Sequence, residues 1–169
     1  MHRESIFIRP EKIDIWREIR WYFSIFIIFS CAGWIYEQIV AVISGRHMEF
    51  ELFWKMYFGV NLPFLQIYGI GAVIVFLASR IMDRMETKNL VSRCIAQGII
   101  LSIFEFLSGV FCLAVFHVRF WDYSDKFMNI GGHVCLLSVF AWFMFSMIFE
   151  MIRKFVYKKA EQRAIINLL

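Results

Sequence analysis

The stretch WYFSIFIIFSCAGWIYEQIVAVIS, residues 21–44, decides the fold of this chain. Its only charged residue is Glu37. A transmembrane helix needs about 20 consecutive, mostly apolar residues, so the stretch predicts a membrane-spanning helix. A cleavable signal peptide is the poorer interpretation, because the run is too long and about 20 basic, amphipathic residues precede it.

Three more runs of this kind follow, at residues 62–82, 94–118 and 130–152. Hydrophobic residues make up 60% of the 169 residues, against about 45–50% in ordinary soluble domains. This composition excludes disordered chains, collagen and soluble Rossmann-type enzymes. The sequence therefore predicts an all-α integral membrane bundle of four transmembrane helices.

The basic residues are distributed unequally between the two ends of these runs. The N-terminus, the second connection and the C-terminal tail together hold 14 of the 18 Lys and Arg residues, and the other two connections hold four. Basic loops stay in the cytoplasm, which predicts that both termini are cytoplasmic. The basic residues then lie beside anionic lipid, so the net charge of +4 does not require a nucleic-acid partner.

Two flanking segments are amphipathic. Residues 11–20 follow Pro10, a favourable residue in the first turn of a helix, and predict an interfacial helix that runs into the first span. Residues 48–58 are too charged to span and predict an interfacial segment on the outer side. The expected organisation is a cytoplasmic amphipathic segment, a four-helix transmembrane domain and a basic cytoplasmic tail, at residues 1–20, 21–152 and 153–169.

Glu37 and Glu105 interrupt otherwise apolar spans. A charge at mid-membrane costs about 2.5–3.5 kcal/mol even on the mildest scale. At 1.5 Å per residue, Glu37 lies about 24 Å and Glu105 about 18 Å above the inner edge, so both fall in the outer half. Tyr68 and His133 are expected at similar depth. Small residues share a helix face with each Glu, which predicts that both face the bundle interior.

Other chemistry is weakly indicated. The chain has no Walker A sequence and no Cys/His cluster with metal-ligand spacing, so we expect no cofactor and no metal site. The four Cys residues lie in apolar runs and are expected to be buried thiols. Glu150 ends the last span beside Arg153 and is expected to be a solvated ion-pair residue.

Five sequence blocks carry a family resemblance. They are Gly33-Trp34-Ile35-Tyr36-Glu37, Leu62-Pro63 with Ile67-Tyr68-Gly69-Ile70-Gly71-Ala72, Glu105-Phe106-Leu107-Ser108-Gly109, Trp121-Asp122-Tyr123-Ser124, and Asn129-Ile130-Gly131-Gly132-His133-Val134-Cys135-Leu136. In this order, over about residues 22–150, they resemble the bacterial ABC-transporter permease family of the CmpB-like, type IV group. The chain departs from the pattern at Gln66, where a proline is expected, and at His133, where the family often has arginine.

The resemblance implies a multi-pass permease subunit in the bacterial cytoplasmic membrane. The polar residues in the outer half would then form its substrate or ion site. A permease of four spans would pair with a separate ATPase and form a homo- or hetero-oligomer. The candidate site residues are Trp34, Tyr36, Glu37, Tyr68, Glu105, Trp121, Asp122, Tyr123, Asn129 and His133.

Two other functions remain open at this point. The carboxyl groups and His133 could serve an intramembrane acid/base enzyme that acts on lipid or cell-envelope intermediates. For that enzyme no nucleophile stands out, although Ser108, Ser124 and Cys112 are available. Alternatively, the chain is an accessory scaffold in which the polar residues only lock the helices together.

Overall fold

The structure, a computed structural model, describes residues 15–44, 59 and 62–166. It contains helices α1 (Ile15–Ser44), α3 (Gln66–Arg84), α4 (Leu90–Phe116) and α5 (Leu136–Ile166). Within the described residues the remaining chain forms turns, loops and one isolated bridge between Ile130 and Val134. All four helices are long and apolar enough to cross a membrane, which confirms the predicted all-α bundle of four spans.

The helix ends differ in places from the predicted runs. Helix α1 begins at Ile15 and continues without a break into the first span, while residues 1–14 and 48–58 lie outside the described residues. Helix α5 begins at Leu136, six residues after the predicted start. The cause is local, because Gly131 and Gly132 adopt positive φ angles of 59° and 73° and turn the chain before the helix.

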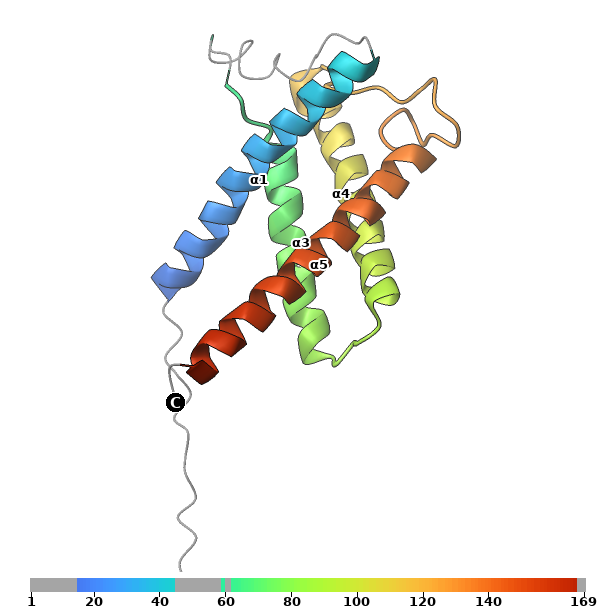
Figure 1. The fold of residues 1–169 in the computed structure, drawn as a ribbon. Coiled ribbons are helices and arrows are strands. Elements are labelled where there is room, and N and C mark those ends of the chain that lie inside the picture. Colours follow the sequence, from blue (N-terminus) through green and yellow to red (C-terminus); the bar gives the residue numbers. More distant parts are fainter. Residues whose placement is uncertain (1–14, 45–58, 60–61, 167–169) are drawn as a thin grey trace, which may run out of the picture.

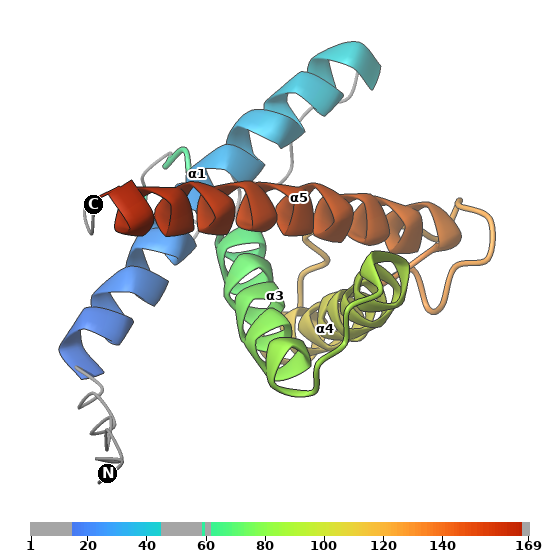
Figure 2. The same cartoon turned by 60° about the horizontal axis from the view of Figure 1, so that its bottom comes forward.

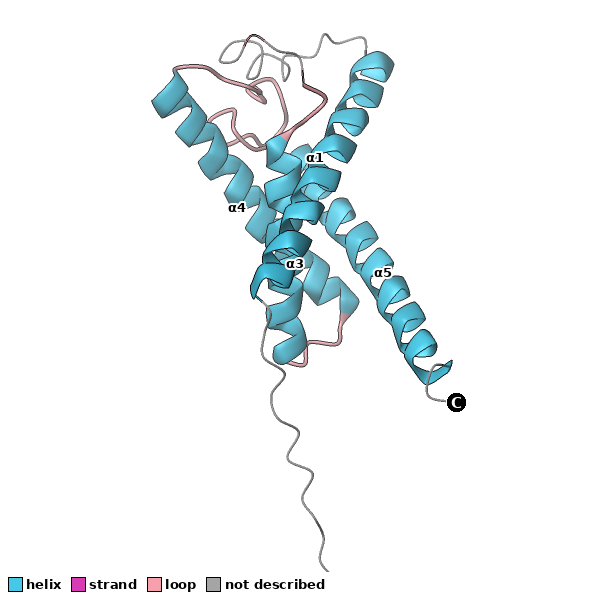
Figure 3. Cartoon of the chain, turned by 90° about the vertical axis from the view of Figure 1, so that its left-hand side faces the viewer, coloured by secondary structure: helices cyan, strands magenta, loops and turns pink. Residues whose placement is uncertain are grey.

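The helices pack in sequence-adjacent pairs. Helices α3 and α4 form a hairpin, α1 packs along α3, and α5 packs along α4. Figure 1 shows α1 and α5 inclined to this hairpin, and Figure 2 shows α5 lying across it. Figure 3 shows the C-terminal part of α5 leaving the other three helices. The result is an open bundle whose close contacts gather near its middle.

Aromatic side chains fill that middle. The buried core residues are Val75, Leu101, Trp142 and Phe149, one or two from each of α3, α4 and α5. Helix α1 reaches this core through Phe29, whose ring centroid lies 5.9 Å from that of Phe145. Edge-to-face contacts of this kind stabilise a core beyond the area they bury.

Helix α4 is capped at both ends, by a side chain at its start and by the backbone at its end. Asn89 accepts hydrogen bonds from the backbone N–H groups of Val91 (2.9 Å) and Ser92 (3.3 Å), which satisfies two of the free donors at the helix start. His117 closes the helix in a left-handed conformation (φ 57°). These caps fix where the α3–α4 connection ends and where the α4–α5 connection begins.

Large apolar side chains cover much of the outer surface of the helices. Val42 and Ile43 on α1 are each 81% exposed, and similar residues are exposed on α3, α4 and α5. In water such a surface would be unfavourable at about 25 cal/mol per Å². Lipid, or further protein within the membrane, is the environment that fits it.

Candidate functional site

Glu37 on α1 is paired with Tyr68 on α3. The Tyr68 hydroxyl donates a hydrogen bond to Oε1 of Glu37, which is partly buried. The pair forms because α1 and α3 approach closely at two glycines. A methyl group added at Gly33 would collide with the Tyr68 ring, and one at Gly69 would collide with Ser30 and the backbone of α1. The small residues of α1 therefore place the carboxyl of Glu37 against α3.

Glu105 on α4 makes a second pair of the same kind. It is 4% exposed, and the Tyr123 hydroxyl donates to its Oε1 at 3.2 Å. Tyr123 comes from the connection between α4 and α5. Ser138 and Trp142 on α5 also interact with this carboxyl group. Glu105 is thus enclosed by the connection and by two helices.

The two pairs lie close enough to interact. The Tyr68 ring contacts Trp142, with 5.7 Å between centroids, and Trp142 also interacts with Glu105. The carboxyl groups of Glu37 and Glu105 interact electrostatically with each other. We call Glu37, Tyr68, Glu105 and Tyr123 the Glu–Tyr cluster. It combines α1, α3, α4 and the connection before α5 in one place.

The electrostatics of the Glu–Tyr cluster are unbalanced. Among the described residues, neither Glu37 nor Glu105 takes part in an ion pair. Burial, followed by the nearby Glu105 carboxyl, raises the pKa of the Tyr123 hydroxyl far above its usual range, so this residue remains a neutral donor. Two carboxyl groups with only neutral donors can share a proton or bind a cation.

Three other candidates pack next to the Glu–Tyr cluster. The Tyr36 ring lies 6.1 Å from the Tyr68 ring. His133 is buried against Gly109 and Phe106 of α4. The indole of Trp121 donates to the backbone carbonyl of His133 at 2.9 Å. The structure therefore places Tyr36 beside Tyr68, and it places Trp121 and His133 against one another beside α4.

Asp122 and Asn129 have a different place. Both are exposed, and they organise the connection between α4 and α5. Asp122 accepts from the backbone and hydroxyl of Ser124, and these hydrogen bonds lower its pKa below 3.8. Asn129 accepts from the Gly132 N–H at 3.2 Å and donates to two backbone carbonyls. Both residues therefore shape the connection that presents Tyr123.

Trp34 differs from the other candidate residues in its hydrogen bonding. Its ring N–H is buried, and no hydrogen-bond acceptor meets it in the described part of the chain. The described residues also contain no group of three or more His, Cys, Asp or Glu side chains that could hold a metal ion.

The opposite end of the bundle contains a polar network that sequence reasoning missed. Glu150 is fully buried, so the prediction that it is solvated is wrong, although it does form ion pairs. Its Oε1 accepts from Arg93 (3.0 Å), Ser79 (2.7 Å) and Gln97 (2.8 Å), and its Oε2 accepts from Arg153 (2.9 Å). The spacing of four between Arg93 and Gln97 on one helix face was the available signal.

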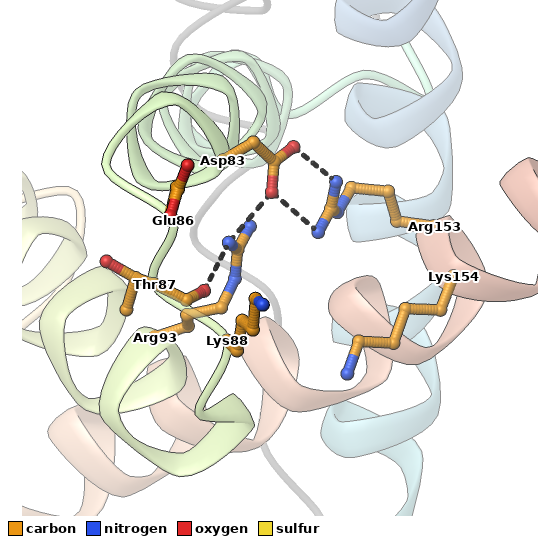
Figure 4. Close-up of a pocket in the computed structure, with 7 residues that line it drawn as sticks. All are labelled: Asp83, Glu86, Thr87, Lys88, Arg93, Arg153 and Lys154. Atoms are coloured by element: carbon orange, nitrogen blue, oxygen red, sulfur yellow. Dashed lines mark hydrogen bonds and ion pairs between the residues drawn. The ribbon is translucent and has the colours of Figure 1, made fainter.

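The structure also has two pockets outside the Glu–Tyr cluster. An apolar one of about 440 Å³ lies between α3, α4 and the following connection, and its lining includes Phe104, Phe111 and Trp121. A polar one of about 450 Å³ lies beside the network, where α3, α4 and α5 meet (Figure 4).

Comparison with known families gives a match over most of the chain. The model of a family described as "Putative ABC-transporter type IV" matches residues 24–168, which include all four residues of the Glu–Tyr cluster. No curated protein and no solved structure shows significant similarity to the chain.

Proposed function

Because the chain belongs to the ABC-transporter type IV family, we propose that it is the membrane-spanning permease subunit of a bacterial transporter. The chain lacks a Walker A sequence, so a separate ATPase subunit would supply the energy. Four spans enclose little space for a pathway, so the subunit would work as part of a homo- or hetero-oligomer.

We further propose that the Glu–Tyr cluster is its substrate or ion site. One contrast carries this proposal. At the end of the bundle near Arg93, the buried carboxyl of Glu150 is neutralised by two arginines. In the Glu–Tyr cluster, the described partners of Glu37 and Glu105 are neutral side chains, above all the hydroxyl groups of Tyr68 and Tyr123. Carboxyl groups left without a counter-charge in a membrane protein are costly, and they are typical of ion, proton or cationic-substrate pathways.

The geometry suggests how such a site would operate. Tyr68 and Tyr123 hold one oxygen of each carboxyl group, and the remaining oxygens can receive a cation or a proton. Because each member comes from a different element, any shift of α1–α3 against α4–α5 changes the distance between the carboxyl groups. Such a shift would change the affinity for the bound ion, as transport requires.

The orientation follows from the basic residues. With 14 of the 18 Lys and Arg residues on one side, both termini are cytoplasmic and the cluster lies in the outer half of the cytoplasmic membrane. Reporter fusions after residue 169 and at Lys126 should report opposite sides. A C-terminus outside the cell would reverse this assignment.

Cation binding provides the test of the site. We expect one of Na⁺, K⁺, Mg²⁺ or Ca²⁺, at constant ionic strength, to raise the unfolding temperature of the detergent-purified protein. Glu37→Gln and Glu105→Gln should remove this effect. Glu86→Gln, which removes an exposed carboxylate in the α3–α4 connection, is the matched control and should keep it.

A proton instead of a metal cation would give a different readout. A protonated carboxyl band should then appear in infrared spectra near neutral pH and vanish in Glu37→Gln or Glu105→Gln. If neither a cation effect nor such a band is found, and the Gln variants are as stable as the wild type, the cluster has only the scaffold role.

The ATPase partner is tested separately. A tagged chain purified from cross-linked native membranes should carry an ATP-hydrolysing protein with it. Purification of the chain without any ATPase would contradict the permease proposal and leave the cation-binding result standing.

A further inference from the structure

The polar pocket of about 450 Å³ lies where three spans end. It is lined by Asp83, Glu86, Thr87, Lys88, Arg93, Arg153 and Lys154, which come from the end of α3, the α3–α4 connection, the first turn of α4 and α5. The apolar parts of these helices end at Arg84, begin at Leu90 and end at Phe155. The pocket is therefore at the level of the lipid headgroups.

The base of the pocket is rigid and electrically balanced. Arg93 donates to Asp83 at 2.8 Å, and Arg153 donates to the same carboxylate at 2.7 Å (Figure 4). Both arginines also donate to Glu150. Arg93 also donates to the Thr87 carbonyl at 3.1 Å, which ties the α3–α4 connection to the base. The guanidinium groups of both arginines are thus paired with carboxylates of the protein, and they hold the surrounding side chains in place.

The two lysines of the pocket differ from the arginines in their exposure and in their ion pairs. Lys88 and Lys154 are exposed, and in the described part of the chain neither forms a salt bridge. Lys88 precedes α4, and Lys154 extends toward it from α5, so their ammonium groups border one opening (Figure 4). Glu86 is the one carboxylate of the lining without an ion pair, so the opening keeps a net positive charge.

We propose that this pocket binds a phosphate group between Lys88 and Lys154. Two ammonium groups suit a cluster of phosphate oxygens, and the nearby start of α4 adds the positive end of a helix dipole. Basic pockets between transmembrane helices at headgroup level bind anionic phospholipids. A soluble phosphate compound offers the same chemistry from the aqueous side.

The test uses the full-length protein in detergent. Binding of phosphatidylglycerol, phosphatidylcholine and inorganic phosphate is measured by native mass spectrometry and by the shift in unfolding temperature. We expect Lys88→Gln and Lys154→Gln each to weaken binding about fivefold, and the double variant about 25-fold, since one basic residue near anionic lipid contributes about 1 kcal/mol. Both side chains are exposed, so these variants should fold normally.

The matched control is the double variant Arg20→Gln/Arg84→Gln. It removes two exposed charges at the same end of the bundle but outside the pocket lining, and it should bind like the wild type. Selective loss of phosphatidylglycerol binding identifies the phosphate as a lipid headgroup. Selective loss of inorganic phosphate binding identifies a soluble ligand. Equal loss in the control, or no loss in the lysine variants, overturns the site.

Discussion

The guanidinium of Arg93 on α4 and the carboxylate of Glu150 on α5 form an ion pair of 3.0 Å, with only 3% and 0% of their side chains exposed. Ser79 on α3 also donates to this carboxylate. The pair therefore connects three helices at one point, close to where the spans end. A buried pair of this kind adds little net stability but is costly to break.

Replacing Arg93 by Met should destabilise the protein strongly. The change leaves Glu150 buried with one arginine fewer and frees the Thr87 and Ser79 carbonyls. Breaking a buried ion pair from one side costs about 3–5 kcal/mol. Thermal and denaturant unfolding in detergent would measure the loss. Arg84→Met, an exposed arginine near the same end, should change stability little; similar losses in both variants would contradict the role of the pair.

The apolar runs were enough to predict four spanning helices, because lipid imposes both length and composition on each one. They could not predict how the helices meet. Ser79, Gln97 and Arg93 each resemble ordinary polar residues near a span end, and only the helix packing brings them to Glu150. The same limit explains the wrong prediction that Glu150 is solvated.

The candidate site was predictable in part. Glu37 and Glu105 stand out in the sequence because a lone charge is costly in lipid. The hydroxyl donor of Glu105 comes from a connection, and periodicity carries no information about which side of a connection faces inward. Asp122 and Asn129 favour turns as readily as binding sites. In the structure they hydrogen-bond within the connection, whereas Tyr123 of the same connection donates to Glu105.

The contact between α1 and α3 predicts different effects for two glycines of α3. Gly69→Ala should destabilise by about 1–3 kcal/mol, because the added methyl group would overlap the Phe26 carbonyl, which belongs to the backbone of α1. Gly71→Ala meets its nearest atom, on Leu101, at 3.4 Å and should be tolerated. Unfolding temperatures of the two variants give the comparison. A tolerated Gly69→Ala would mean that α1 and α3 lie further apart.

Tyr123→Phe should lower the free energy of unfolding, measured by denaturant unfolding in detergent, by about 1–3 kcal/mol. The change removes a hydrogen-bond donor from the buried Glu105 carboxyl. Tyr36→Phe is the matched control, since Tyr36 is half exposed and makes a ring contact with Tyr68. In the Glu105→Leu background, Tyr123→Phe should have little further effect. An undiminished loss in that background would show that Tyr123 acts through another partner.

The connection between α4 and α5 should respond to acid through Asp122. Its hydrogen bonds with Ser124 exist when the carboxyl is charged, so its folded pKa lies below 3.8. The resulting stabilisation is present above the unfolded pKa and is lost as the pH falls through the folded one. Ser124→Ala should therefore raise the Asp122 pKa, as measured by carboxyl NMR in detergent. An unchanged pKa would remove Ser124 as the cause.

Cysteines placed at positions 37 and 105 should be joined by a short bifunctional maleimide, because the two carboxyl groups interact across the Glu–Tyr cluster. The four native cysteines, at 31, 94, 112 and 135, must first be replaced by alanine. The cross-linked product is detected by the loss of both free thiols and is identified by mass spectrometry of the linked peptides.

Cysteines at 37 and 83 are the control, since Asp83 belongs to the network at the other end of α3 and should not be linked to α1 at this position. Efficient linking of 37 to 105 but not to 83 would place both carboxyl groups in one site. If 37 and 105 stay unlinked in a folded protein, the two Glu–Tyr pairs are separate structural features and cannot bind one ion together.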